Sequence, residues 1–395
     1  MWFNDLISFS MVGLTIYIWI IGIGMIINEK NERNIQMISW FCIMNLIIII
    51  SFLTNNILFF FLCFEGALIP LFVLVGGWGS RKEKEKAALY LFFYTFLSSI
   101  FFFITIAYTY SFTGSMNFYQ WGNIIGKEWI SAAILVPMLV KLPVWPLHLW
   151  LPLAHVEAPT VGSVVLAGIV LKLGGYGLIR WWLFIGGGGD SFLTPIIISL
   201  GIISLIYAGF ISGRQADLKR LIAYSSVGHM GMVAVGIVIG SCLGLKGSVI
   251  VMIGHGFTSA GMFASVGIIY LRSHVRTIRY LGGISYGMPI FSFLFILIIL
   301  GSMGFPPSIN FIGELFIINQ TIVSSGFILI LSITLGLTVG VYYHLFMVNR
   351  ILFGQNKSFK RTNDLSIWEF IMMICWVFPV FFGGAFLPSW AWGAK

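Results

Sequence analysis

The chain has 395 residues, of which 59% are hydrophobic and only 9% are charged, and its formal net charge is +9. A mean hydropathy of +0.99 lies far above that of soluble globular domains and leaves no room for a separate soluble domain. Apolar stretches of about 20 residues, the length that crosses a bilayer as a helix, recur along the whole chain. We therefore predict one all-α, polytopic membrane domain over residues 1–395.

The apolar stretches predict about twelve crossings, one of them interrupted. In chain order they are residues 11–28, 37–54, 57–79, 87–112, 130–150, 161–185, 193–212, 218–240, 247–271, 286–322, 326–350 and 365–388. The tenth is long and contains Gly304, Pro306 and Pro307, so it could instead be two crossings.

Loop charges favour one broken helix at the tenth position. With this choice one side of the membrane collects sixteen basic residues: Lys30, Arg33, Arg81, Lys82, Lys84, Lys86, Arg214, Lys219, Arg220, Arg272, Arg276, Arg279, Arg350, Lys357, Lys360 and Arg361. The other side has only Lys127, Arg180, Lys246 and Lys395. Basic loops stay on the inner side, so both termini are expected outside. The net charge then needs no nucleic-acid partner.

Two crossings are broken in a comparable way, which predicts an internal repeat. The fifth contains Pro137, Pro143 and Pro146, and the tenth contains the break at residues 304–307. Each is the fourth member of a five-helix set, residues 37–185 and residues 193–350, and an odd number of crossings inverts the second set. A single C-terminal helix, residues 365–388, follows. Paired breaks of this kind point to an ion pathway, although prolines also occur in membrane helices without such a function.

Four charged side chains lie within the predicted crossings: Glu65, Lys141, Lys172 and Glu314. Each costs roughly 3 to 17 kcal/mol in hydrocarbon, so it needs a partner or a wet cavity. A buried lysine tends to release its proton, and a neighbouring carboxylate retains it. Glu65 and Lys141 are therefore expected to act as a switch of proton affinity; the alternative is a static ion pair between two helices.

Two membrane histidines are further candidates for proton transfer. His255 lies among glycine, serine and threonine residues near the centre of the ninth crossing, and His229 lies on a similar polar stripe of the eighth. Histidine relays protons at physiological pH, but a hydrogen bond to a neighbouring hydroxyl is the alternative. His148, His155 and Glu157 are expected at the inner interface.

Cofactor sites are not indicated by the sequence. The four cysteines stand singly, without the C-x-x-C spacing of zinc or iron–sulfur sites. Haem needs two facing histidines, usually repeated along one helix pair, and no predicted crossing contains two. We therefore expect neither a metal nor a cofactor in this chain.

Several motifs resemble one known family: VKLPVWPLHLWLPLAHVEAPTVGSVVLAGIVLKLGGYGLIRW, DLKRLIAYSSVGHMGMV, HGFTSAGMF and NFIGELFI. From about residue 57 to its C-terminus the chain resembles subunit 4 of NADH:ubiquinone oxidoreductase, respiratory complex I. It is also similar to Mrp-type cation/proton antiporter subunits.

This resemblance implies a role for each buried group. Glu65 would be the carboxylate of the Glu and Lys pair, Lys141 the pumping lysine and Lys172 the central relay lysine. His255 would lead onward to Glu314, the terminal acid. FMN, iron–sulfur clusters and ubiquinone would belong to other subunits. The partners would be other membrane subunits of complex I, including neighbouring antiporter-like subunits, and lipids.

The resemblance also has a departure and leaves alternatives open. Family members usually have about fourteen crossings with this glutamate on the fifth, whereas Glu65 lies on the third, so about two N-terminal helices are expected to be missing. The channel residues remain, so we expect pumping to be retained. We expect the chain to lie in the mitochondrial inner membrane, with its basic loops in the matrix. A bacterial plasma membrane is the alternative location. An Mrp-type Na⁺/H⁺ antiporter subunit and a scaffold that does not pump are the alternative functions.

Overall fold

The computed structural model describes residues 5–28, 33–123, 127–187, 191–324, 327–355 and 363–393. Within these residues, ten helical segments are long and apolar enough to cross a membrane. They are α1 (Leu6–Asn28), α2 (Asn34–Leu53), α3 with α4 (Ile57–Gly66 and Leu68–Trp78), α5 (Lys84–Thr113), the continuous segment Thr160–Ile185, α10 (Thr194–Arg214), α11 (Leu218–Val238), α12 (Cys242–Ser273), α16 (Phe327–Leu352) and α17 (Ile367–Gly393).

Two further pairs of shorter helices contain the predicted breaks. The first pair is α6 (Lys127–Lys141) and α7 (Trp150–Glu157), and the second is α14 (Pro289–Ser302) and α15 (Ile309–Ser324). The remaining short elements are η1 (Phe118–Asn123), η4 (Ile278–Tyr280) and α13 (Ile284–Gly287). Both breaks fall where the prolines and Gly304 predict them.

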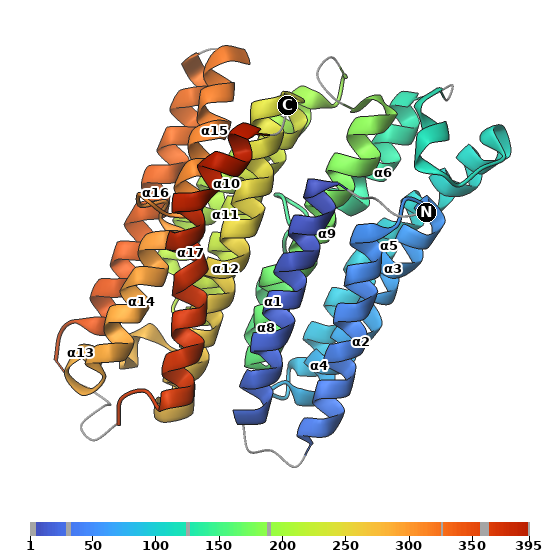
Figure 1. Ribbon diagram of the computed structural model, residues 1–395. Coiled ribbons are helices and arrows are strands. Elements are labelled where there is room, and N and C mark those ends of the chain that lie inside the picture. Colours follow the sequence, from blue (N-terminus) through green and yellow to red (C-terminus); the bar gives the residue numbers. More distant parts are fainter. Residues whose placement is uncertain are drawn as a thin grey trace.

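The long helices run roughly side by side in one bundle (Figure 1). α1 and α2 lie on one side of the view, and α14 to α17 lie on the other. Thr160–Ile185, α11 and α12 are buried along almost their whole length, whereas the outer helices bury one face. α12 packs against α8 (Thr160–Val165), α11, α15 and α17, so it is the centre of the bundle.

Close helix contacts in the core depend on small residues. A Cβ added to Gly201 on α10 would lie 2.8 Å from the Gly231 carbonyl oxygen on α11, and the reverse distance is 2.7 Å. No side chain larger than hydrogen fits at either position, which lets the two backbones approach closely. The dry, close packing fixes the polar side chains that these helices carry.

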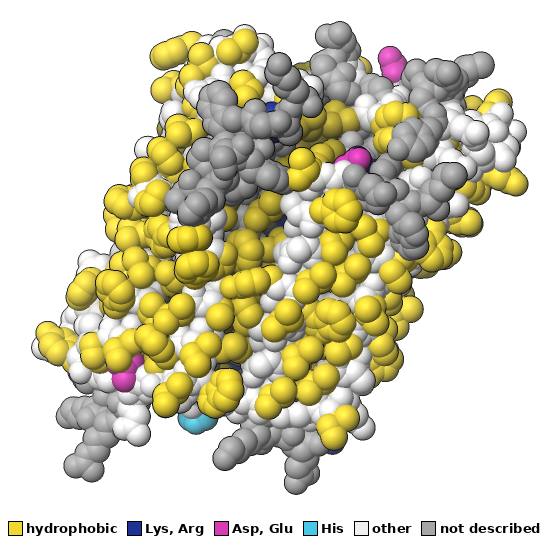
Figure 2. Space-filling model, in the orientation of Figure 1, with side chains coloured by type: hydrophobic (Ala, Val, Ile, Leu, Met, Phe, Trp, Pro, Cys, Tyr) yellow, Lys and Arg dark blue, Asp and Glu magenta, His cyan; other side chains and the backbone are white. Residues whose placement is uncertain are grey.

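The molecular surface is apolar over most of the face in Figure 2, with few acidic or basic side chains. Many large hydrophobic side chains are more than half exposed, among them Ile20, Phe93, Phe210, Ile328 and Trp368. Such a surface is stable only in contact with lipid or with partner subunits. The chain is therefore an all-α, polytopic membrane protein, as its composition predicts.

One predicted crossing has a backbone that the sequence does not indicate. Residues 161–185 were expected to form a single α-helix, but α9 (Leu171–Gly177) lies between two π-helical stretches, η2 (Leu166–Val170) and η3 (Leu178–Gly187). π-helical turns widen the helix and are frequent at functional sites. The central charge Lys172 lies on the short α-helical segment between them.

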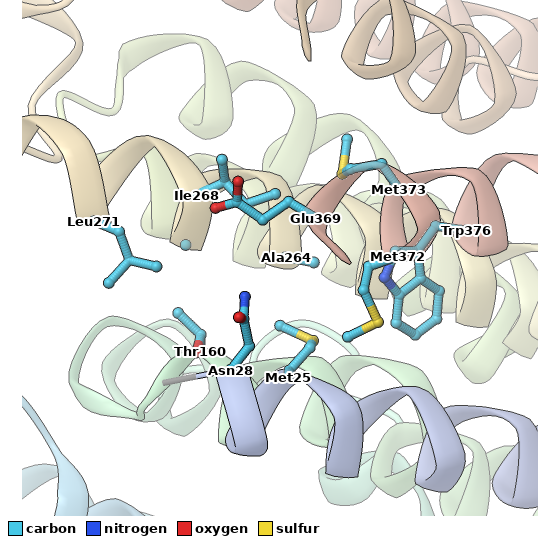
Figure 3. Close-up of a pocket in the computed structure, with 11 residues that line it drawn as sticks. Met25, Asn28, Thr160, Ala264, Ile268, Leu271, Glu369, Met372, Met373 and Trp376 are labelled. Atoms are coloured by element: carbon cyan, nitrogen blue, oxygen red, sulfur yellow. The ribbon is translucent and has the colours of Figure 1, made fainter. Parts of the chain in front are cut away.

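A narrow crevice of about 60 Å³ lies between the C-terminal ends of α1 and α12 and the N-terminal part of α17. Figure 3 shows Met25 and Asn28 of α1 facing Met372 and Trp376 of α17 across it. Beside it, Glu369 accepts two hydrogen bonds from the Arg272 guanidinium, at 2.6 and 2.9 Å. This bidentate pair joins α17 to the central helix α12.

Candidate functional site

The first break places Lys141 at the very end of α6. Pro143 and Pro146 cannot donate backbone hydrogen bonds, so the helix does not continue beyond this point. The break frees the carbonyl of Val140, which accepts a hydrogen bond of 2.9 Å from the Trp150 indole. The Lys141 side chain is 1% exposed, so the break presents its ammonium to the protein interior.

Among the described residues, no ion pair within 4.0 Å joins Glu65 and Lys141. The Lys141 ammonium donates to the Phe64 carbonyl and lies 3.2 Å from the centroid of the Phe64 ring, a cation–π contact. Glu65 Oε1 is buried and has no hydrogen-bond partner among the described residues. The two side chains are therefore neighbours whose ion pair is open in this structure.

Lys172 is completely buried and contacts two partners. Its ammonium donates to the Ala167 carbonyl in η2 and lies 2.8 Å from His255 Nδ1 on α12. The sequence places these two side chains 83 residues apart, and only the packing of α12 on η2 brings them together. Lys172 thus has a direct histidine partner in this structure.

The contact between Lys172 and His255 extends further through the bundle, to His229 and Glu314. The rings of His255 and His229 are 5.5 Å apart between centroids, and His229 Nδ1 lies 3.8 Å from Glu314 Oε1. All three side chains are less than 10% exposed. Together with Lys172 they form a buried row of four titratable groups, which comes from α9, α12, α11 and α15. His229 lies between His255 and Glu314.

Three atoms of this row lack a hydrogen-bond partner among the described residues. They are His255 Nε2, His229 Nδ1 and Glu314 Oε1, and each is buried. Buried polar atoms are almost always hydrogen-bonded to protein or to an ordered water. The row is therefore suited to hold mobile protons or single waters between its members.

The second break shapes the environment of Glu314. Gly304 has a positive φ of 69°, which glycine adopts without strain, and a Cβ at this position would collide with Glu314 Oε2. At the break, the Gly301 carbonyl accepts a hydrogen bond of 3.0 Å from the Asn310 amide and one of 3.4 Å from the Gly304 backbone N–H. Each break thus has one side chain that donates to a carbonyl beside it, Trp150 in the first and Asn310 in the second.

A cavity of about 20 Å³ adjoins the Glu314 end of the row. Its lining includes His229, Glu314, Ser302, Tyr343 and His344. His344 Nε2 lies 3.0 Å from the Ser302 hydroxyl, and both side chains are buried. The volume is sufficient for about one water molecule. Ser302 and His344 were not assigned a role from the sequence, although His344 is a histidine within a predicted crossing.

Lys141 and Lys172 belong to adjacent backbones. A Cβ added to Gly174, two residues after Lys172, would lie 2.6 Å from the backbone nitrogen of Leu142. No hydrogen bond or ion pair among the described residues joins the two lysines. The six predicted site residues are therefore arranged as the pair Glu65 and Lys141 beside the row Lys172, His255, His229 and Glu314.

The three side chains expected at the inner interface are buried within the protein. His148 and His155 are at most 1% exposed, and none of their ring nitrogens has a hydrogen-bond partner among the described residues. The His155 ring stacks on Phe263 with 4.4 Å between centroids. Glu157 lies 4.0 Å from Arg81, and burial raises the pKa of its carboxyl although Arg81 and Arg276 oppose this effect.

In the described part of the chain, no group of three or more His, Cys, Asp or Glu side chains is placed to hold a metal ion. Three helices deliver His255, His229 and His344, but their ring contacts are to Lys172, to each other and to Ser302. The property that these histidine side chains share is that each can bind and release a proton.

The fold and the buried row define a class, the antiporter-like polytopic membrane subunits. Residues 54–339 match the profile of a family described as NADH:quinone oxidoreductase/Mrp antiporter, transmembrane region. In structure the chain is similar to a subunit of respiratory complex I from Thermus thermophilus with bound NADH. The TM-score is 0.88 with 21% identity, and the match covers 97% of this chain and 82% of the other.

Sequence relatives define the family more narrowly. NADH-ubiquinone oxidoreductase chain 4 of Metridium senile is 41% identical over 85% of this chain and 69% of its own length. Chain 4 of Marchantia polymorpha is 36% identical over 90% and 73%, and chain 4 of Acanthamoeba castellanii is 35% identical over 98% and 79%. The chain therefore belongs to the NADH-ubiquinone oxidoreductase chain 4 family, the antiporter-like membrane subunits of complex I.

Proposed function

We propose that this chain translocates protons in the membrane arm of respiratory complex I, driven by NADH oxidation and ubiquinone reduction in other subunits. The observation that carries the proposal is the buried row Lys172, His255, His229 and Glu314. Four titratable side chains from four elements meet there in the buried core. Such groups within membrane helices are costly and mark proton relays.

Each member of the row has a separate role in the transfer. The Lys172 ammonium holds a proton against His255 Nδ1, which accepts it when the lysine loses its stabilisation. Protonated His255 then releases a proton toward His229, directly or through one water. Glu314 receives it 3.8 Å from His229 Nδ1, beside the cavity of about 20 Å³. The π-helical turns on both sides of Lys172 supply a backbone that can reorient the lysine.

Opening and closing of the ion pair between Glu65 and Lys141 controls proton transfer along the row. In the open arrangement the Lys141 charge is held by the Phe64 carbonyl and ring. A shift of α3 toward α6 closes the ion pair and retains the Lys141 proton, and separation favours its release. Because the backbone of Leu142 touches Gly174, movement at this break reaches α9 and Lys172.

We further propose that the chain spans the mitochondrial inner membrane. Of the twelve crossings, residues 11–28 form the first, two inverted sets of five, residues 37–185 and 193–350, each contain one broken helix, and residues 365–388 form the last. The basic loops face the matrix and both termini face the intermembrane space. Lipids, neighbouring antiporter-like subunits and other membrane subunits of complex I surround the chain, and FMN, iron–sulfur clusters and ubiquinone are held elsewhere.

The alternative functions have less support. An Mrp-type Na⁺/H⁺ antiporter subunit has the same fold, but the relatives described above are chain 4 of NADH-ubiquinone oxidoreductase. A scaffold without conduction would not need buried charges at a common site, because apolar residues of similar volume stabilise a core at least as well.

Replacement of Lys172 by methionine tests the proposal. The complex that contains this chain is reconstituted in vesicles, and protons moved per NADH oxidised are measured. We expect Lys172→Met to lower this ratio, because the row loses its first proton carrier. The exposed Lys86 provides the control Lys86→Met, for which the ratio stays unchanged. An unchanged ratio in a fully assembled Lys172→Met complex would refute the proposed role.

A further inference from the structure

One buried histidine lies outside the row from Lys172 to Glu314. His344 is 1% exposed, although its helix, α16, is one of the two least buried of the ten long helices in the described part of the chain. Its side chain lines the cavity of about 20 Å³ that adjoins Glu314. The titratable residues of this lining are His229, Glu314, Tyr343 and His344. His344 is therefore close to the last two members of the row, and it comes from a fifth element.

The contacts of its ring determine where His344 accepts a proton. Nδ1 lies 2.9 Å from the Gly340 carbonyl oxygen, which can only accept, so Nδ1 carries a hydrogen. Nε2 lies 3.0 Å from the Ser302 hydroxyl, which can donate or accept. The same hydroxyl lies 2.8 Å from the Ile299 carbonyl oxygen, one turn earlier on α14. In the neutral ring the lone pair is therefore on Nε2, facing Ser302.

Ser302 satisfies both protonation states of this histidine without movement of a heavy atom. Beside neutral His344, the Ser302 hydroxyl donates to Nε2. Beside protonated His344, Nε2 donates to Ser302 Oγ, and the hydroxyl hydrogen rotates to the Ile299 carbonyl. That carbonyl also accepts from the Met303 backbone N–H, so it has a partner in both states. A buried polar atom without a partner would cost about 1 to 3 kcal/mol, and His344 avoids this cost whether it is neutral or charged.

The second break holds Ser302 at the Glu314 end of the row. Ser302 is the last residue of α14, and Gly304, with its φ of 69°, turns the chain directly after it. A Cβ on Gly304 would lie 3.2 Å from Glu314 Cδ, so this turn contacts the carboxyl group. Glu314 Oε1 is buried and has no hydrogen-bond partner among the described residues. The cavity that Ser302 and Glu314 both line has room for about one water molecule, the usual bridge between polar groups that do not touch.

We propose that His344 is a further proton-accepting residue, which takes the proton of Glu314 through one water molecule and the Ser302 hydroxyl. The Glu314 carboxyl gives its proton to the water, the water gives a hydrogen to Ser302 Oγ, and the original hydroxyl hydrogen moves to His344 Nε2. One O–H bond breaks at Glu314 and one N–H bond forms at His344, while the water and the hydroxyl are restored. The resulting carboxylate and imidazolium attract each other across the cavity. This role rests on the proton translocation proposed above, and it extends the path from α15 to α16.

Two substitutions remove the two parts of this extension. His344→Gln keeps hydrogen-bonding groups but does not bind a proton at neutral pH, and Ser302→Ala removes the hydroxyl. Protons moved per NADH oxidised are measured in assembled complexes in vesicles. We expect each variant to lower the ratio to the value found for Lys172→Met, because all three block one path, and Ser302→Thr, which restores a hydroxyl, to recover it. The matched control is Ser212→Ala, since buried Ser212 likewise donates to the carbonyl three residues earlier, at 2.7 Å; its ratio should equal that of wild type.

Parallel measurement of Lys172→Met separates this role from the proposed function. If Lys172→Met lowers the ratio but assembled His344→Gln pumps like wild type, the proton does not use His344, and the extension is wrong while the row stands. If both variants keep the wild-type ratio, the proposed function fails and the extension fails with it. If His344→Gln does not assemble, the two Ser302 variants decide. A wild-type ratio in Ser302→Ala, or a ratio in Ser302→Thr as low as in Ser302→Ala, would overturn the role of the hydroxyl and of His344.

Discussion

Replacement of Gly304 by alanine perturbs the end of the row without removing a titratable group. Gly304 has a φ of 69°, and a Cβ there would lie 3.2 Å from Glu314 Cδ and nearer still to Oε2. Real Cβ atoms do not approach this closely, so the carboxylate must move by at least several tenths of an ångström. His229 Nδ1 is only 3.8 Å from Glu314 Oε1, and the displacement changes this gap directly.

The expected effect of Gly304→Ala has two parts, a backbone cost and a loss of proton transfer, and a control variant can separate them. Alanine in the left-handed region costs about 1 to 2 kcal/mol wherever it occurs. Displacement of a catalytic group by about 1 Å costs up to roughly 100-fold in rate, and the smaller shift here should cost roughly tenfold in proton transfer. Gly114 has a nearly identical φ of 64° with open space around its Cβ position. Gly114→Ala therefore loses stability only through the backbone strain of alanine at a positive φ.

Proton uptake into vesicles and NADH oxidation are measured together for both variants. We expect Gly304→Ala to lower the number of protons moved per NADH, and Gly114→Ala to match wild type. Native electrophoresis confirms that both complexes are assembled. If assembled Gly304→Ala and Gly114→Ala pump equally, the position of the Glu314 carboxylate does not control transfer, and the reasoning is wrong.

Two further predictions concern the packing around the row. Gly174→Ala places a methyl group 2.6 Å from the Leu142 nitrogen, so the complex should not assemble normally, as measured on native gels. In the control Gly76→Ala the nearest neighbour of the added methyl group is 3.8 Å away, so this variant should assemble normally. Glu369→Gln removes the charge that holds Arg272, which should lower the local stability of α17 by about 1 to 3 kcal/mol. Amide hydrogen exchange of α17 in the complex should therefore accelerate roughly 5- to 150-fold. The exposed control Glu85→Gln should leave this exchange unchanged; an equal effect of both would contradict a structural role of the pair.

The positions of the breaks could be predicted from the sequence. Pro143 and Pro146 remove backbone donors, and Gly304 precedes two prolines, so the loss of helix there follows from local chemistry. Composition likewise predicts the membrane environment. The structure confirms both, with α6 ending at Lys141 and α14 ending at Ser302.

The contacts within the site could not be predicted in the same way. Lys172 meets His255 across 83 residues, and His229 meets Glu314 across the contact of α11 with α15. These pairings depend on how whole helices rotate against each other, which periodicity cannot determine when helices are buried on every side. The π-helical turns around Lys172 have no sequence signal either, because Leu166–Val170 reads as an ordinary apolar helix.

The central claim is that Lys172 and Glu314 act in one proton path. Protons moved per NADH oxidised are measured for Lys172→Met, for Glu314→Gln and for the double variant in assembled complexes. Two blocks in one path cannot remove more than one block does. We therefore predict a lowered ratio that is the same in all three variants. A double variant that loses the sum of the two single losses, or single variants with the wild-type ratio, would contradict a continuous row from Lys172 to Glu314.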